Sequence, residues 1–151
     1  MARLGKIVAA GALAGILAAS ASCTQPRRFT ATRAAPATIP LLLPPGTAAV
    51  SDATRYIDIT VDDFRPSLTG PVQIVVDAVT GRSQTEIGRF AIYPERSFVT
   101  NDRAEPQHFG LAVPPGLRLD RSTRLIVRIV PSRGDGAGAT IAVESARFRP
   151  R

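Results

Sequence analysis

Apolar and polar residues alternate in short runs from Val50 to the end of the chain. Ile57, Ile59 and Val61 alternate with polar residues, a period of two that places apolar side chains on one face of a strand. The same kind of pattern predicts further strands at 71–79, 85–94, 108–113, 124–130 and 140–148, and a short strand is also considered at 97–100 within a polar, irregular stretch. No stretch repeats apolar residues with a helical period over three turns, so the pattern does not predict a long helix.

Turn-forming residues separate these runs about every ten positions, as in the stretches PSLTG and TGRS. This spacing predicts an all-β domain over residues 50–151, an antiparallel β-sandwich or jelly-roll-like fold with six to seven strands. A domain of that length can bury enough apolar area to fold without metals or disulfides. The last two predicted strands flank the Gly-rich segment Pro131–Gly138, and we expect a closing hairpin with a mobile, exposed tip.

The first 22 residues have the composition of an export signal. A short basic stretch with Arg3 and Lys6 precedes the apolar run IVAAGALAGILAA, which is short for a membrane span, and small residues follow. Ala19-Ser20-Ala21 offers a site for ordinary cleavage, which would release a soluble periplasmic or secreted protein. Ser20 to Cys23 is similar to a bacterial lipobox, although the usual Leu is missing. The second interpretation predicts a lipoprotein on the periplasmic face of a bacterial membrane, anchored through the lipidated Cys23.

Residues 23–49 are rich in proline and contain no acidic residue. Because proline fixes φ and lacks an N–H donor, this segment is predicted to be an extended tether. The piece from Ile39 to Pro45 is apolar enough to lie against the domain as a bound arm or an edge strand, and its prolines allow an edge position at best.

The formal charge is +7 at pH 7 and falls to +5 once Arg3 and Lys6 leave with the signal. The arginines are scattered, and few aromatic residues lie between them. Nucleic-acid partners usually require a clustered basic surface, so we expect none here.

The chain is poor in catalytic and metal-binding side chains. His108 is the only histidine, and no spacing singles out Ser83, Ser97 or Asp102 as its partner. Asp62 and Asp63 are adjacent in a strand and should point to opposite faces, which disfavours joint chelation of calcium. We therefore expect no enzyme, no metal and no cofactor. The tripeptide at Arg133 to Asp135 is interpreted as a turn rather than an adhesion motif.

Four pieces follow one another in a familiar order: GPVQIVVDAV, GRFAIYP, HFGLAVPPGLRLDRSTRLIVRIVPSRG and ATIAVESARF. This order resembles the C-terminal β-domain of polyphenol oxidases and tyrosinases, over roughly Arg55 to Phe148. The copper-binding helical domain of that family is absent, and VQIVVD does not keep the family's Phe-Asp pair. No copper site or oxidase activity is therefore carried over.

In that family the β-domain covers the copper entrance of the oxidase. The resemblance implies a free-standing, non-catalytic accessory to a separately encoded copper oxidase or another envelope protein. The alternative is a general envelope lipoprotein that binds a glycan, lipid or protein through its loops. The residues predicted for the interaction surface are Arg96, Phe98, Arg103, His108, Phe109 and Arg118.

Overall fold

The computed structural model describes residues 27–45, 55–101 and 104–150, and these form nine β-strands and no helix. The strands are β1 (Phe29–Thr32), β2 (Ala37–Leu42), β3 (Arg55–Arg65), β4 (Val72–Thr80), β5 (Ser83–Phe90), β6 (Phe98–Val99), β7 (Gln107–Ala112), β8 (Arg124–Pro131) and β9 (Thr140–Pro150). The all-β prediction is confirmed, and the seven predicted strands correspond to β3 through β9.

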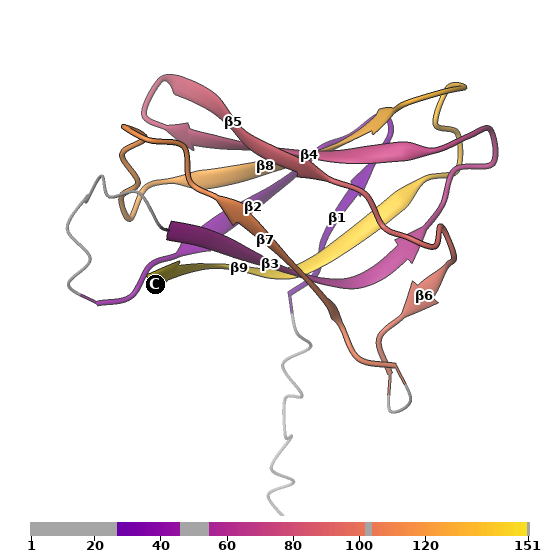
Figure 1. Ribbon diagram of the computed structural model, residues 1–151, viewed down its shortest axis with the longest axis horizontal. Coiled ribbons are helices and arrows are strands. Elements are labelled where there is room, and N and C mark those ends of the chain that lie inside the picture. The colour runs from indigo at the N-terminus through magenta and orange to yellow at the C-terminus, as the bar shows by residue number, and fades with distance from the viewer. Residues whose placement is uncertain (1–26, 46–54, 102–103, 151) are drawn as a thin grey trace, which may run out of the picture.

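One continuous sheet is folded into two facing layers (Figure 1). Its strand order is β5-β4-β8-β2-β9-β3-β6, with β1 also paired to β9 and β7 also paired to β3. We call β2, β4, β5 and β8 the upper layer and β1, β3, β6, β7 and β9 the lower layer. All pairings are antiparallel except that of β2 with β9, so the sheet is mixed rather than purely antiparallel.

Strand β2 joins the two layers, because Ala37–Pro40 pair with β8 while Leu41 and Leu42 pair with β9. The structure therefore differs from the predicted tether over residues 23–49, since residues 29–32 and 37–42 are strands of the sheet. Strand β2 is not an edge strand as a whole, but each of its residues is paired on one side only, as the proline argument requires. No residue of β2 has a register partner on both sides, so the missing N–H of Pro40 interrupts no continuous ladder.

The predicted terminal hairpin is wrong. Among the described strands, β8 pairs with β2 and β4, whereas β9 pairs with β1, β2 and β3. The two strands lie in opposite layers and face each other across the core. Alternation shows which side chains point inward. It does not show whether two successive strands pair in one layer or lie in facing layers, because the apolar pattern is identical in both cases.

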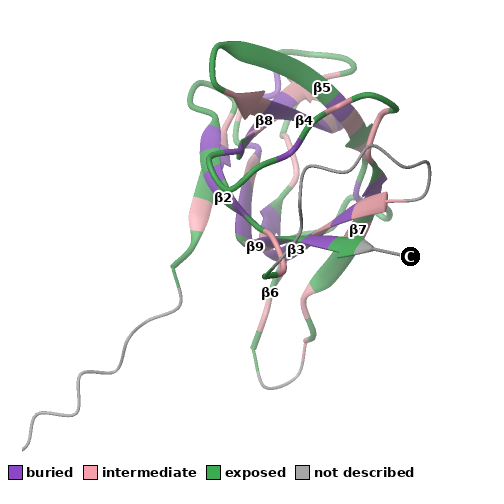
Figure 2. Cartoon of the chain, turned by 90° about the vertical axis from the view of Figure 1, so that its left-hand side faces the viewer, coloured by how far each residue is buried: buried purple, intermediate pink, exposed green. Residues whose placement is uncertain are grey.

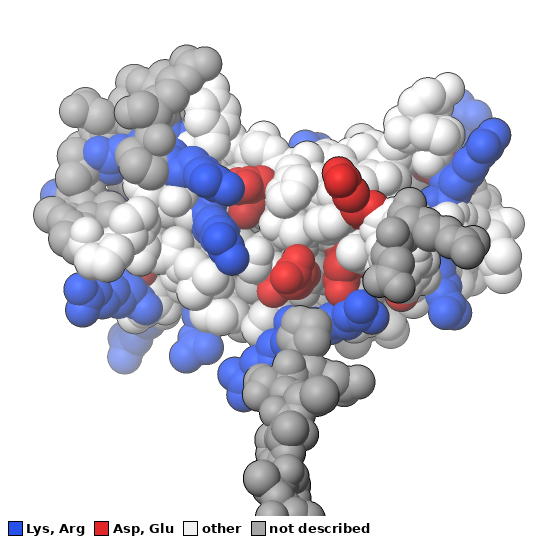
Figure 3. All heavy atoms as spheres, turned by 90° about the horizontal axis from the view of Figure 1, so that it is seen from below, with Lys and Arg blue, Asp and Glu red and all other residues white. Residues whose placement is uncertain are grey.

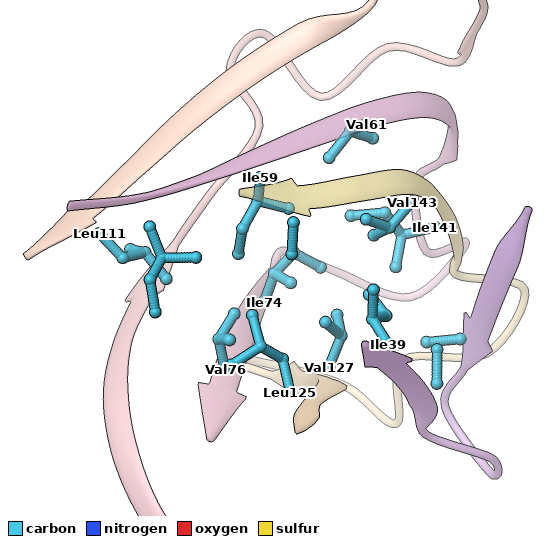
Figure 4. Packing of buried hydrophobic residues seen from close by; sticks show 14 of the residues in the cluster. Ile39, Ile59, Val61, Ile74, Val76, Leu111, Leu125, Val127, Ile141 and Val143 are labelled. Carbon is cyan, nitrogen blue, oxygen red and sulfur yellow. The ribbon is translucent and has the colours of Figure 1, made fainter. Parts of the chain in front are cut away.

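The core lies between the layers, where the inward rows of the strands meet (Figures 2 and 4). Ile39 of β2, Val127 of β8 and Val143 of β9 are fully buried there. At the opposite side of the molecule the ring of Phe90 in β5 stacks on Phe109 in β7, with centroids 4.1 Å apart. The layers thus meet through β2 on one side and through this aromatic pair on the other.

Candidate functional site

The structure does not gather the predicted interaction residues on one face. His108 and Phe109 are neighbours in β7 and point to opposite sides of the lower layer, so His108 is exposed while Phe109 packs against the core. Phe98 in β6 is also half-buried, with its ring centroid 6.4 Å from that of Phe64. Arg96 is exposed in the connection that precedes β6. Arg103 lies outside the described residues, as does Cys23.

The connection from β5 to β6 carries the most exposed aromatic side chain of the described residues. Tyr93 is 92% exposed, and Val99 at the end of β6 is 43% exposed. We call residues 91–101 the Tyr93 segment. Its exposed aromatic, aliphatic and arginine side chains have the composition that is enriched in protein interfaces. Arg96 and Phe98 of this segment are among the residues predicted from the sequence, whereas Tyr93 is not, although its alternation with Phe90 and Ile92 is a readable signal of an outward position.

Arg118 lines a hollow of about 310 Å³ together with residues of β4, β5 and the loop after β7. Three hydroxyl side chains, those of Thr80, Ser83 and Thr85, share this lining. The sequence-based prediction placed Arg96, Arg103 and Arg118 together on one interaction surface. Arg118 lines this hollow and Arg96 does not, while Arg103 lies outside the described residues.

His108 lies on the outer face of the lower layer beside Asp58 and Thr60. Its Nδ1 is 3.5 Å from Asp58 Oδ1 and 3.4 Å from Thr60 Oγ1. In a nucleophile–base–acid relay the two imidazole nitrogens serve different partners. Here the hydroxyl and the carboxylate share one nitrogen, so the arrangement does not form such a relay. The hydroxyl beside His108 belongs to Thr60, and not to the serines considered from the sequence.

Acidic side chains gather near the middle of this outer face, with arginines around them (Figure 3). Asp62 is the most buried of its ionisable groups, with a side chain only 6% exposed and a 2.6 Å ion pair from Arg28 Nε to its Oδ2. Burial raises the pKa of Asp62, and the nearby Arg28 opposes that rise. Oδ1 of Asp62 is buried with no hydrogen-bond partner in the described part of the chain.

The RGD tripeptide belongs to a hydrogen-bonded loop. Oδ1 of Asp135 accepts hydrogen bonds from the hydroxyl of Thr69 (2.6 Å) and the backbone N–H of Ala137 (2.9 Å). The N–H of Leu68 donates to the carbonyl of Ala137. The loop between β8 and β9 is therefore attached to the β3–β4 turn, which differs from the free tip that the sequence suggested and agrees with interpreting the tripeptide as a turn.

Two features that often mark function are absent from residues 27–45, 55–101 and 104–150. In that part of the chain no three His, Cys, Asp or Glu side chains come together as a metal-binding group. The same residues contain no helix long and apolar enough to cross a membrane.

Comparison with known proteins identifies no relative. A scan against protein-family models finds no match, and searches of curated proteins and of solved structures find no significant match either.

Proposed function

We propose that this chain is a non-catalytic interaction module of the bacterial cell envelope that binds a protein partner through the Tyr93 segment. The observation that carries the proposal is the 92% exposure of the Tyr93 ring in a segment that also presents Val99. Tyrosine supplies a large contact area with few rotatable bonds, and tyrosine and arginine recur among the residues that dominate binding energy. Arg96 lies between these two residues in the sequence and is exposed as well.

The proposed lipid anchor at Cys23 lies close in sequence to the first strand of the fold. Because β1 begins at Phe29 and Arg28 is paired with Asp62, the described fold starts only a few residues after Cys23. Four peptide links separate Cys23 from Arg27, and they span at most about 14 Å when extended. A lipidated Cys23 would therefore hold the outer face of the lower layer close to the membrane.

The sequence resemblance suggests a type-3 copper oxidase as the partner to test first. Affinity capture uses the tagged full chain, expressed in its own host and recovered from membrane extract. We expect the oxidase with the unaltered chain and with Leu68→Ser, and its loss with the pair Tyr93→Ser and Val99→Thr. Leu68 is the matched control, because it is 86% exposed on the β3–β4 turn, outside the Tyr93 segment. Repeated capture without a copper protein would remove the oxidase as partner, and capture unaffected by the pair would remove the Tyr93 segment as the contact.

The Arg118 hollow favours a second candidate, an envelope lipoprotein that binds a glycan. Its threonine and serine hydroxyls can exchange hydrogen bonds with sugar hydroxyls, and Arg118 supplies a donor for an acidic sugar. Binding of acidic envelope glycans that is lost in Arg118→Gln and kept in the exposed control Arg121→Gln would support this candidate. Equal binding by both variants would exclude it.

A further inference from the structure

A second hollow, of about 250 Å³, opens between the β1–β2 turn and the edge of β8 at residues 128–131. Its lining includes two arginines, Arg33 from the turn and Arg128 from β8. Pro36 and Pro131 also line it and supply apolar surface. None of these residues belongs to the Tyr93 segment, so the inference below goes beyond the proposed function and does not rest on it.

The hollow exists because β2 covers only part of β8. The register pairs Ala37–Pro40 with residues 124–127 of β8, and β2 does not extend to residues 128–131. Those four residues pair with β4 on their other side. Where β2 is missing, the chain turns through Arg33 to Pro36 and leaves a space beside the strand.

Each arginine is held by its Nε atom. Arg128 Nε donates to Oδ2 of Asp77 at 2.9 Å, and Asp77 is itself buried and accepts a second hydrogen bond from Gln84. Arg33 Nε donates to the backbone carbonyl of Asp135 at 3.2 Å. Neither guanidinium uses its terminal nitrogens in a hydrogen bond within the described part of the chain, so donors remain available on side chains whose positions are already fixed. Fixing donors in advance lowers the entropy cost of binding an oxyanion.

The charged side chains around the hollow favour an anionic ligand. The carboxylate of Asp77 offsets Arg128, whereas Arg33 Nε is bonded to a neutral carbonyl. The nearby Asp135 carboxylate directs Oδ1 to Thr69 and to the backbone N–H of Ala137. The Asp135 carboxylate also interacts electrostatically with Arg33, but no acidic residue is among the lining residues. The charged side chains of the described lining are therefore both guanidinium groups, which favour an anion.

We propose that this hollow binds the carboxylate of a small monocarboxylic acid, with the Nη atoms of Arg33 and Arg128 on the carboxylate oxygens. Planar guanidinium groups match a carboxylate with two parallel hydrogen bonds. The apolar chain of the acid lies against Pro36 and Pro131. The volume suits an acid of a few carbon atoms, because drug-sized ligands need roughly 300 Å³ or more.

Butyrate and its neutral analogue butyramide test the proposal on the unaltered full chain as it is recovered from cells. Calorimetry at low salt should show saturable binding of butyrate, with butyramide at least about tenfold weaker because it lacks the charge that the arginines recognise. Equal binding of the two compounds, or no binding of butyrate at millimolar concentration, would overturn the proposal. Tighter binding of phosphate than of butyrate would also overturn it, because it would show a site for a more highly charged anion.

Variants then locate the site. Arg33→Gln should weaken butyrate binding about tenfold while the fold is kept, because Arg33 Nε bonds only to a backbone carbonyl. Arg124→Gln is the matched control, since Arg124 is exposed on β8 and does not line the hollow. Arg128→Gln leaves the buried Asp77 without its cation, so its result is used only if circular dichroism shows an unchanged strand spectrum. Equal affinity of Arg33→Gln and Arg124→Gln would place the carboxylate elsewhere.

Discussion

The hydroxyl of Thr69 donates a 2.6 Å hydrogen bond to the carboxylate of Asp135 and thereby joins two turns that are 66 residues apart in sequence. The same Thr69 Oγ1 lies 3.3 Å from the backbone nitrogen of Asp135 and 3.2 Å from that of Gly136. The link attaches the β3–β4 turn to the loop between β8 and β9, and both of these connections run between the two layers. Together with the backbone hydrogen bond from Leu68 to Ala137, this side chain holds the loop in which the chain passes from β8 to β9.

The link should be visible in the titration of Asp135. The hydrogen bond from Thr69 lowers the pKa of Asp135, because it stabilises the ionised carboxylate. Thr69→Val should therefore raise that pKa towards its usual value, as measured by NMR of the carboxyl carbon. Thr30→Val, on the outer face of β1, should leave it unchanged.

Asp135 should make the folded state less stable as the pH falls. Because the pKa of Asp135 is lower in the folded state, its contribution to stability is present above the usual aspartate pKa and is lost as the pH falls through the lowered value. Thr69→Val should flatten that acid-side decline. An unchanged decline, or an unchanged Asp135 titration, would contradict the role assigned to the hydroxyl.

Gly134 and Gly81 form a matched pair for testing the same contact. Both have a positive φ, of 69° and 60°, but a Cβ on Gly134 would lie 2.4 Å from the Thr69 carbonyl oxygen, whereas a Cβ on Gly81 would meet nothing within 4 Å. Gly81→Ala should cost about 1–2 kcal/mol through its backbone conformation alone. Gly134→Ala should cost clearly more in urea unfolding, and equal costs would show that the two turns do not approach each other as described.

Ile39 tests whether residues 37–42 belong to the folded body. Its side chain is fully buried among the core residues, so Ile39→Ala should lower the free energy of unfolding by about 2–5 kcal/mol. Thr38→Ala, at the exposed neighbouring position, should change it by less than about 1 kcal/mol. If both variants unfold like the unaltered chain, the segment is a tether, as its prolines suggested.

The ion pair between Arg28 and Asp62 predicts a second pH effect, with the opposite sign. Burial raises the folded pKa of Asp62 above its unfolded value, so this residue makes stability fall as the pH rises through that range. Arg28→Ala removes the interaction that opposes the shift, so the decline should extend to higher pH. At pH 7 the loss should be about 1–3 kcal/mol, because a buried carboxylate loses its partner.

Arg27→Ala is the matched control for this pair, since Arg27 is exposed and next to Arg28 in the sequence. Chemical unfolding of both variants between pH 4 and pH 8 measures the effect. Parallel stability profiles for the two variants would contradict the assigned pair.

Alternation of apolar residues was sufficient to predict the longer strands β3, β4, β5, β7, β8 and β9, because each directs side chains into the core. Strand β6 has only two residues and shows no such row. Ile57, Ile59 and Val61 are fully buried, as their spacing predicted. The pattern could not reveal β1 and β2, since four residues are too few to show a period and Pro40 argued against a paired strand. Nor could it assign strands to layers, because the partner of β8 depends on contacts distant in sequence.

The functional surfaces were less predictable than the strands. Phe109 was selected as an exposed aromatic residue, but its place in β7 turns it towards Phe90 and the core. Tyr93 alternates with Phe90 and Ile92, so the pattern placed it away from the core, but the extent of its exposure became apparent only with the fold. The hollow between Arg33 and Arg128 depends on where β2 stops pairing with β8, which no local signal encodes.

The most direct test of the central claim, that this module acts by contact through the Tyr93 segment, is site-specific photocrosslinking in living cells. A photoreactive amino acid at position 93 or 99 should give a discrete cross-linked adduct after irradiation, whereas the same probe at position 68, which is more exposed than position 99, should give none. No adduct at positions 93 and 99, or the same adduct at all three positions, would contradict the account.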